Sequence, residues 1–316
     1  MTQTALMTLT AETMTAELRS AAAFLALPEP RAVDRIILAA LEEDSPHGDL
    51  TGEAYLPVDA RADALLRARV PGVLSGGPVI RRVFELVDPA VQVDLLAQDG
   101  AEFQAGDVLA RIQGPARSVL LGERIALNLS QRMSAIATAT AALVAAVTGT
   151  RARVADTRKT TPGLRVLERY AVRCGGGSNH RYSLSDAVMV KDNHLAVLTG
   201  GDPAKITQAL LDGKSRLGHT VHVEVEVDRL DMIEPVLAAG VDTIMLDNFS
   251  LEDLAEGVRC VAGRAIVEAS GNVRLETIAD IAATGVDVIS SGALTHSVAA
   301  LDLGLDIDIS AGESTP

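Results

Sequence analysis

The stretch VHVEVEVDRLDMIEPVLAAGVDTIMLD, residues 221–247, contains two short β-branched runs with an amphipathic segment between them. The runs are VHVEVEV (221–227) and DTIMLD (242–247), and the segment between them is LDMIEPVLAAG (230–240). Strand-like runs that alternate with helical segments are typical of parallel βα units. The stretch therefore predicts a parallel sheet whose strands are joined by helices.

The same rhythm continues on both sides of this stretch. The further strand-like runs are RARVAD (151–156), DAVMVK (186–191), AIVEAS (265–270) and VDVISS (286–291). Six such strands within about 140 residues favour a closed or nearly closed α/β barrel. A doubly wound open sheet is the alternative that the pattern leaves open.

The residues before 151 follow different patterns. Residues 29–44 carry a helical apolar stripe, and residues 122–149 carry a longer one that predicts a single buried helix ending near Gly149. Between them, short alternating runs from Arg61 to Ile112 are separated by glycine-containing turns and predict a small half-buried sheet. The first 20 or so residues are rich in Thr and Ala, and we expect them to fray.

Composition excludes several classes of protein. The chain has 316 residues, a formal net charge of −14, a pI near 4.9 and 2% aromatic residues without tryptophan. Nucleic acid and anionic membranes both reward a basic face, so we predict neither as a partner. Two cysteines define no disulfide framework, and the N-terminus lacks the basic start and apolar core of a signal peptide. We therefore predict a cytoplasmic protein without a membrane span.

Positive charge is concentrated between residues 151 and 191, where nine lysines or arginines face three acidic residues. The chain has only four lysines against twenty-four arginines, and two of the four, Lys159 and Lys191, fall here. A lysine supplies a compact point charge where an arginine supplies a planar fork. The concentration predicts a pocket for a small molecule with several negative charges.

Polar residues also stand at the exit of each predicted strand. In an α/β barrel the loops at the carboxyl ends of the strands carry the site. In chain order, the exits hold Arg158 and Lys159; Lys191, Asp192 and Asn193; Glu224 and Glu226; Asp247 and Asn248; Glu268, Ser270, Gly271 and Asn272; and Ser290, Ser291 and Gly292.

Carboxylates among these cations need a reason, because a polyanionic ligand would repel them. Glu224 and Asp247 on successive strand ends fit Mg²⁺ held together with phosphate oxygens, or contacts to hydroxyl groups. The turns 270–272 and 290–292 offer backbone N–H groups for a phosphate at a helix start. Cys174 next to Arg173 is a weaker candidate for a nucleophile, because the sequence shows no arrangement of His or Asp residues around it.

These residues closely resemble the signature of the quinolinate phosphoribosyltransferase family. The resemblance rests on ADTRKTTPGLRVLERYAVRCGGGSNHRYSLSDAVMVKDNH (155–194) and on six shorter motifs in the same order, which together cover most of residues 36–297. The shorter motifs are ALEEDSPHGDLT, GERIALNLSQRMSAIATAT, EVEV, IMLDNF, EASGNV and ISSGALTHS. Ala135 departs from the glycine usual in the family, and we expect it to affect packing more than chemistry.

The resemblance implies an enzyme of NAD biosynthesis. It would convert quinolinate and 5-phosphoribosyl 1-diphosphate into nicotinate mononucleotide, diphosphate and CO₂, with Mg²⁺. The implied fold is an N-terminal α/β sandwich domain, residues 1–126, joined by the C-terminal segment 297–316, and an incomplete TIM-like α/β barrel, residues 127–296. The implied assembly is a homodimer with shared active sites, or a larger oligomer.

The resemblance also implies roles residue by residue. The quinolinate carboxylates would contact Arg124, Arg158, His180, Arg181 and Lys191. The phosphoribosyl diphosphate and its metal would contact Lys159, Glu224, Asp247 and the turns Ser270, Gly271, Asn272 and Ser290, Ser291, Gly292. Thr157 would belong to the substrate-binding set, and Lys159, Lys191, Glu224 and Asp247 to the catalytic set. Glu224 and Asp247 would hold the Mg²⁺, partly through substrate and water.

Two other functions remain as alternatives. A relative with the same fold could use another acceptor, such as nicotinate, or act as the pyrophosphorylase associated with molybdenum transport. A barrel without activity could instead bind a phosphorylated metabolite as a sensor, although the intact lysines and carboxylates at the strand ends argue against lost catalysis.

Overall fold

The computed structural model describes residues 27–310, and the chain divides into two compact units. Among the described residues, the first unit takes in 27–139, Thr161–Gly176 and 298–310, and the second takes in Thr140–Thr160 and Gly177–Ser297. The Thr- and Ala-rich start, for which we predict fraying, lies outside the described residues. No helix within residues 27–310 combines the length and apolarity needed to cross a membrane.

Six parallel strands form the sheet of the second unit, and they coincide with the six predicted runs. In chain order they are β6 (Arg153–Ala155), β7 (Val188–Val190), β8 (Val223–Val227), β9 (Thr243–Asp247), β10 (Ile266–Ser270) and β11 (Val288–Ser290). Their spatial order is β6-β11-β10-β9-β8-β7, so each strand from β7 to β11 adds on the same side and β6 closes onto β11. A doubly wound sheet reverses direction at a switch point, and this sheet does not. The sheet is a barrel that is open between β6 and β7.

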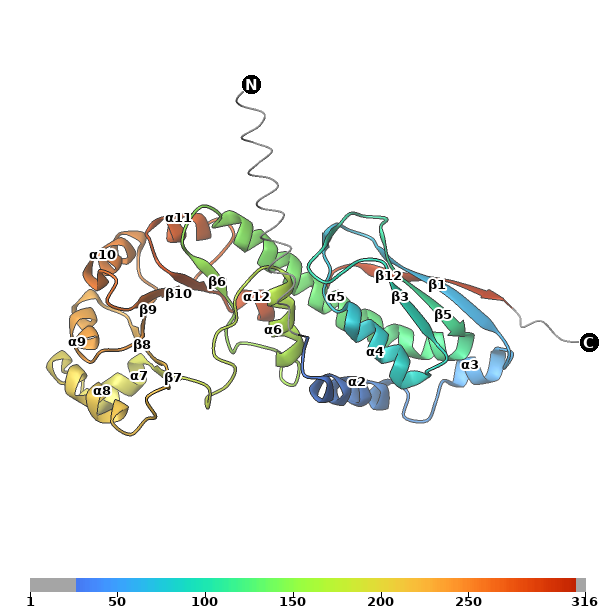
Figure 1. The fold of residues 1–316 in the computed structure, drawn as a ribbon, viewed down its shortest axis with the longest axis horizontal. Coiled ribbons are helices and arrows are strands. Elements are labelled where there is room, and N and C mark those ends of the chain that lie inside the picture. Colours follow the sequence, from blue (N-terminus) through green and yellow to red (C-terminus); the bar gives the residue numbers. More distant parts are fainter. Residues whose placement is uncertain (1–26, 311–316) are drawn as a thin grey trace, which may run out of the picture. The chain divides into compact units, whose positions relative to one another are not determined.

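Helices cover the outside of this sheet (Figure 1). They are α7 (Asp192–Thr199), α8 (Ile206–Lys214), α9 (Ile233–Ala238), α10 (Leu251–Val261), α11 (Ile278–Ala283) and the short α12 (Ala293–His296). Side chains alternate between the two faces of a strand. On β8, Val223, Val225 and Val227 therefore occupy one face while Glu224 and Glu226 occupy the other, and all five are buried. The barrel interior thus carries carboxylates.

An antiparallel sheet organises the first unit, as the alternating runs predict. Its spatial order is β12-β1-β5-β3, with a separate β2-β4 pair. The strands are β1 (Arg61–Ala68), β2 (Gly72–Val73), β3 (Gln92–Leu95), β4 (Glu102–Phe103), β5 (Val108–Pro115) and β12 (Leu303–Ser310). The register runs from Arg61 opposite Ser310 to Ala68 opposite Leu303. Strand β12 therefore pairs with β1 along the length of both strands.

The helices that precede the barrel are α2 (Pro30–Asp44), α3 (Leu50–Tyr55), α4 (Gly77–Val87) and α5 (Ala116–Ala146). The predicted helix at 29–44 is confirmed as α2. The predicted long helix begins earlier, at Ala116, and ends before Gly149, whose φ of +87° is left-handed. Gly122 of α5 permits close packing, because a Cβ there would lie 2.8 Å from Phe84 of α4. Ala135 is buried in α5 at 5% exposure.

The predicted division between residues 126 and 127 differs from the observed one. The observed division falls within α5 because this helix runs without interruption from one unit into the other. Helix α6 (Arg165–Cys174) belongs to the first unit and not to the barrel. Its Glu168 pairs with Arg132 of α5, and its Tyr170 donates a hydrogen bond to Asp99 over 2.8 Å.

Helix α6 also begins later than its sequence suggests. Thr161 followed by Pro162 favours a helix start, yet the helix begins at Arg165. Gly163 has a φ of +84°, which a helix cannot contain, and the N–H of Thr161 donates to the Glu168 carboxylate at 3.1 Å. The residues between β6 and α6 therefore form a turn that is tied back to the helix.

Candidate active site

The barrel gathers the predicted polar residues at the carboxyl ends of its strands. Because the six strands are parallel, their exits lie at one end of the second unit. The residues at these exits are Thr157, Arg158 and Lys159 after β6, Lys191 after β7, Asp247 at the end of β9, Ser270 at the end of β10 and Ser290 at the end of β11. The structure therefore brings the predicted strand-end residues to one end of the barrel.

A buried aspartate fixes the segment that carries His180. Asp156 is 0% exposed, and its Oδ1 accepts a hydrogen bond from the backbone N–H of His180 at 2.7 Å. Its Oδ2 accepts from the Asn179 side-chain amide at 2.6 Å. Ser178 forms an isolated parallel bridge with Ala155, which places this segment beside β6. The glycine run before them leads the chain from α6 onto the barrel.

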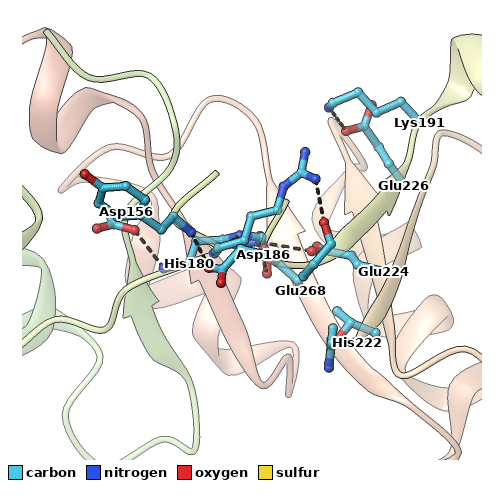
Figure 2. A network of polar contacts seen from close by, with 12 residues as sticks. Asp156, His180, Asp186, Lys191, His222, Glu224, Glu226 and Glu268 are labelled. Carbon is cyan, nitrogen blue, oxygen red and sulfur yellow. Dashed lines mark hydrogen bonds and ion pairs between the residues drawn. The ribbon is translucent and has the colours of Figure 1, made fainter. Parts of the chain in front are cut away.

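His180, Glu224 and Glu268 meet inside the barrel (Figure 2). His180 Nε2 lies 3.1 Å from Glu224 Oε2 and 3.4 Å from Glu268 Oε2. Both glutamates are 3% exposed, and the Oε1 atom of each is buried and has no hydrogen-bond partner among residues 27–310. A cavity of about 380 Å³ extends from this cluster toward the amino ends of the strands, where Arg153, Thr243, Ile266 and Val288 also line it.

The ligand-type atoms of this cluster lie within 4.8 Å of one another, which is a spacing that a metal ion could use. The other ring nitrogen argues against a metal. His180 Nδ1 accepts a hydrogen bond from the backbone N–H of Arg181 at 2.7 Å. A neutral imidazole has only one nitrogen with a free lone pair. Nε2 therefore carries the proton and donates it to the two carboxylates.

The site perturbs several pKa values. Burial opposes a charged imidazole, but the hydrogen bonds and charges of Glu224 and Glu268 outweigh it and raise the pKa of His180 to about 10. A second proton would have to displace the hydrogen bond that Nδ1 accepts from Arg181, so in the geometry seen here the ring is neutral despite this raised pKa. Burial also raises the pKa of Glu224. Burial and the neighbouring charge of Arg158 lower the pKa of Arg181. Such shifts gather at functional sites.

The register of β8 separates the roles of its two glutamates. Lys191 Nζ forms an ion pair with Glu226, not with Glu224. In the pairing of β8 with β9, Glu226 lies opposite Met245 and Glu224 lies opposite Thr243. Asp247 is therefore two residues along β9 from the partner of Glu226 and four residues from the partner of Glu224. At about 3.3 Å per residue, these offsets are about 7 Å and about 13 Å. The predicted metal pair of Glu224 and Asp247 is therefore not assembled, because Glu224 contacts His180 deeper in the barrel. Glu226 is the β8 carboxylate nearer to Asp247.

A strained turn supports Asp247. Asn248 and Asn272 have left-handed φ values of 59° and 52°, and Gly271 has 95°. A Cβ on Gly271 would lie 2.2 Å from Asn248 Oδ1. The Asn248 amide donates to Asp247 Oδ2 at 2.7 Å, and the Asn272 amide donates to Asn248 Oδ1 at 3.3 Å. Left-handed residues other than glycine are held in place only by their surroundings and gather at functional sites.

The predicted helix start after this turn is wrong. Ser270 ends β10, but α11 begins only at Ile278, so the turn 270–272 does not open a helix. The second turn does, because α12 follows Gly292 directly, although α12 has only four residues. Ser290 is buried with an Oγ that has no hydrogen-bond partner, and the N–H of Ser291 donates to Ala155 O at 3.0 Å.

Lys159 packs against this second turn. A Cβ on Gly292 would lie 2.7 Å from Lys159 Cδ and 3.1 Å from the His296 ring. Thr295 Oγ1 donates to the carbonyl oxygen of Lys159 at 2.7 Å, and Thr157 Oγ1 accepts from the Lys159 N–H at 3.1 Å. The glycine thus makes room for a lysine and a histidine at one strand exit.

Only part of the positive charge between residues 151 and 191 belongs to this end of the barrel. Arg151 pairs with Asp287 at 3.1 Å, and Arg153 begins β6 at the opposite end of the strand. Three further arginines, Arg165, Arg169 and Arg173, lie on α6 in the first unit. Arg124 is exposed on α5, also in the first unit. Arg158, Lys159 and Lys191 follow strand ends of the barrel, whereas His180 and Arg181 precede β7, and Arg181 Nη1 donates to Ala187 O at the amino end of that strand.

Sequence reasoning missed three residues of this site. Glu226, Glu268 and His296 all lie inside motifs quoted above, but none was assigned a role. The alternation in EVEV places Glu224 and Glu226 on one face, and only the distance to the strand exit distinguishes them. His296 follows Gly292 by four residues, which is one helical turn.

The cysteine beside Arg173 is not a nucleophile. Cys174 is 6% exposed, and burial raises the pKa of its thiol to about 12. Its sulfur contacts Ser75 Oγ at 3.3 Å within the first unit. A thiol that stays protonated is unreactive, so Cys174 has a packing role.

Known proteins share this architecture and sequence. Residues 136–306 match the family described as quinolinate phosphoribosyl transferase, C-terminal domain, and residues 49–134 match its N-terminal domain. A probable nicotinate-nucleotide pyrophosphorylase [carboxylating] of Bacillus subtilis is 40% identical, with 85% of this chain and 91% of that protein covered.

Solved structures give the same result. The crystal structure of NadC from Streptococcus pyogenes is 41% identical with a TM-score of 0.85, and covers 90% of this chain and 99% of that one. The nicotinate-nucleotide pyrophosphorylase from Francisella tularensis is 37% identical with a TM-score of 0.82, covering 89% and 97%. With both family domains matched in order and the polar strand ends assembled in one barrel, the chain belongs to the quinolinate phosphoribosyltransferase family.

Proposed function

We propose that this chain transfers the phosphoribosyl group of 5-phosphoribosyl 1-diphosphate to quinolinate and releases diphosphate and CO₂, forming nicotinate mononucleotide for NAD biosynthesis. The observation that carries the proposal is the meeting of crowded cations with two carboxylates at the carboxyl end of one barrel. Arg158, Lys159 and Lys191 supply the charge, and Glu226 and Asp247 supply the carboxylates.

The cations suit quinolinate, which has two carboxylates on adjacent ring carbons. Arg158 and Arg181 repel one another, and a dianion between them would relieve that repulsion. Lys191 is held by Glu226 in the ligand-free protein and would exchange this partner for, or share it with, a substrate carboxylate. His180 stands beside Arg181, and its Nδ1 accepts the Arg181 backbone N–H.

The remaining strand exits suit the second substrate. Lys159 beside Gly292, the buried Ser290 hydroxyl and the turn 270–272 offer donors to phosphate oxygens. Glu226 and Asp247 are oxygen ligands of the kind that Mg²⁺ takes together with substrate phosphates and water. We assign the metal to this pair in place of Glu224 and Asp247. When bound, Mg²⁺ would neutralise the charge of the departing diphosphate.

The chemistry requires orientation more than covalent help. The pyridine nitrogen forms a bond to the ribose C1 while the bond from C1 to the diphosphate oxygen breaks. The ring nitrogen becomes cationic, and the C2–carboxylate bond then breaks with its electron pair left on C2. A proton adds to C2 and completes the product. The cations hold the ring in line with C1, and nearby carboxylates stabilise the positive charge that develops on the ribose.

An acceptor assay tests the proposal against both alternatives. Purified protein should release diphosphate with quinolinate and not with nicotinate, because only quinolinate has two carboxylates for the cations. Turnover of nicotinate alone would assign the chain to another acceptor. Binding of phosphoribosyl diphosphate without any acceptor-dependent release would favour the sensor.

Neutralising Glu226 tests the revised metal assignment. Glu226→Gln should lower kcat/KM for phosphoribosyl diphosphate by roughly a hundredfold, because a carboxylate near developing positive charge is lost. Steady-state rates at varied Mg²⁺ should show a higher metal requirement. A variant with unchanged metal dependence would return the assignment to Glu224.

We also propose a cytoplasmic homodimer, or a larger oligomer built from it, in which each site takes Arg124 from the other chain. The support is the family resemblance and the position of Arg124 on α5, outside the barrel unit. A two-fold assembly exchanges equivalent surfaces, so each chain would complete its partner's site.

A further inference from the structure

We propose that Glu268 is a positioning residue, which holds the His180 imidazole, and through it the Arg181 backbone amide, in the orientation that quinolinate requires. This role rests on the proposed function. Glu268 lies on β10, and its Oε2 is 3.4 Å from His180 Nε2. Its Oε1 has no hydrogen-bond partner, so the imidazole is its one polar contact within the described residues.

Glu268 does not resemble a carboxylate kept for stability. Asp156 and Glu168 are equally buried, and each uses both of its oxygens in hydrogen bonds. Glu268 leaves one buried oxygen unsatisfied. A buried carboxylate with so few partners costs more free energy than an apolar side chain of similar size. Its retention therefore needs a reason other than folding.

The contacts of His180 supply that reason. Glu224 on β8 and Glu268 on β10 hold the ring from two strands that are separated by β9. The opposite ring edge accepts the N–H of Arg181, and Arg181 Nη1 donates to Ala187 O at 2.8 Å, just before β7. A ring released from Glu268 could turn about its side-chain bonds and would no longer fix the backbone at Arg181.

Two variants separate positioning from structure. Glu268→Leu removes the acceptor and the buried charge, whereas Glu268→Gln keeps an oxygen that can accept from Nε2. Glu168→Leu is the matched control, since it removes a buried glutamate whose two oxygens are both bonded. The measurements are the thermal midpoint, kcat, and the KM for each substrate.

Glu268→Leu should keep or raise the thermal midpoint and raise the quinolinate KM by about ten- to a hundredfold, a range typical of lost outer-shell partners. Its KM for phosphoribosyl diphosphate should change less than about twofold, since no phosphate ligand moves. Glu268→Gln should have a quinolinate KM close to that of the wild type. The control should lower the thermal midpoint instead. A Glu268→Leu variant with an unchanged quinolinate KM, or with both KM values raised alike, would overturn the role.

The same samples separate this inference from the proposed function. A wild-type protein without quinolinate turnover would refute the function itself. Wild-type turnover with an unaffected Glu268→Leu variant would refute only the positioning role. Thermal shifts with MgCl₂ or ZnCl₂ and no substrate test whether His180, Glu224 and Glu268 bind a metal ion instead. Stabilisation of the wild type but not of Glu268→Leu would make the cluster a cation site and overturn the proposal.

Discussion

At the scale of single residues, Gly271 is the position where shape matters most. Its φ of +95° disfavours any other residue, and a Cβ would lie 2.2 Å from the Asn248 amide that holds Asp247. Gly271→Ala should therefore cost more than the 1–3 kcal/mol or so that left-handed strain alone costs. It should also lower kcat/KM at least about tenfold, because a shift of about 1 Å at a site has effects of that order or larger.

Gly263→Ala is the matched control for this prediction. Gly263 has a φ of +75°, but no atom lies within 4 Å of a Cβ built there, so the variant carries strain without collision. Urea unfolding and steady-state kinetics of the two variants measure the difference. Equal losses of stability with full activity in both would show that the turn at Gly271 does not support the site.

Some residues of the site could be predicted from the sequence and others could not. The polar strand exits were predictable because parallel strands expose the same end of the sheet. The choice between Glu224 and Glu226 was not, since both share a face and differ by one pleat in depth. Strand register and the exact strand exit settle it, and both depend on pairing with β9, which lies outside the local sequence.

At the scale of elements, the ion pair between Arg132 of α5 and Glu168 of α6 anchors the turn after β6. Glu168 is 1% exposed and Arg132 28%, with a separation of 2.6 Å. A double-mutant cycle should give a coupling of about 2–4 kcal/mol, at or below the range for fully buried pairs because Arg132 keeps contact with water.

The exposed pair of Arg264 and Glu234 is the control for this cycle. Its side chains are 47% and 70% exposed, and such pairs contribute about 0–1 kcal/mol. Denaturant titrations of the single and double variants give both couplings. Similar values for the two pairs would mean that α6 is held to α5 by apolar packing alone.

Elements were predictable where local patterns and tertiary packing agreed. All six barrel strands appear where β-branched runs predict them, because strands in parallel sheets are buried on both faces. For helix α6, the sequence predicts neither the observed start nor the unit to which the helix belongs. Its start follows a left-handed Gly163 and a hydrogen bond from Thr161 to Glu168, which are local but which the residue types alone do not specify. Its unit follows contacts with Arg132 and Asp99, which are distant in the sequence.

At the scale of the whole molecule, the proposed sharing of sites between two chains predicts rescue between inactive variants. Arg124→Ala and Lys191→Ala should each be nearly inactive alone. Random exchange makes half of the dimers mixed, and each mixed dimer has one intact site of two, so activity should recover to roughly a quarter of wild type. The test is an assay after dissociation and mixing, with exchange confirmed by mass. Confirmed exchange without recovery would mean that Arg124 serves its own chain or only its fold.

In the proposed reaction, phosphoribosyl transfer is coupled to loss of the quinolinate carboxylate next to the ring nitrogen. The most direct measurement uses quinolinate labelled in either the 2-carboxylate or the 3-carboxylate, together with phosphoribosyl diphosphate, Mg²⁺ and the purified chain. We predict labelled CO₂ from the 2-carboxylate alone, in a one-to-one ratio with diphosphate, and retention of the 3-carboxylate label in the nucleotide. Diphosphate release without labelled CO₂, or CO₂ from the 3-position, would contradict the account.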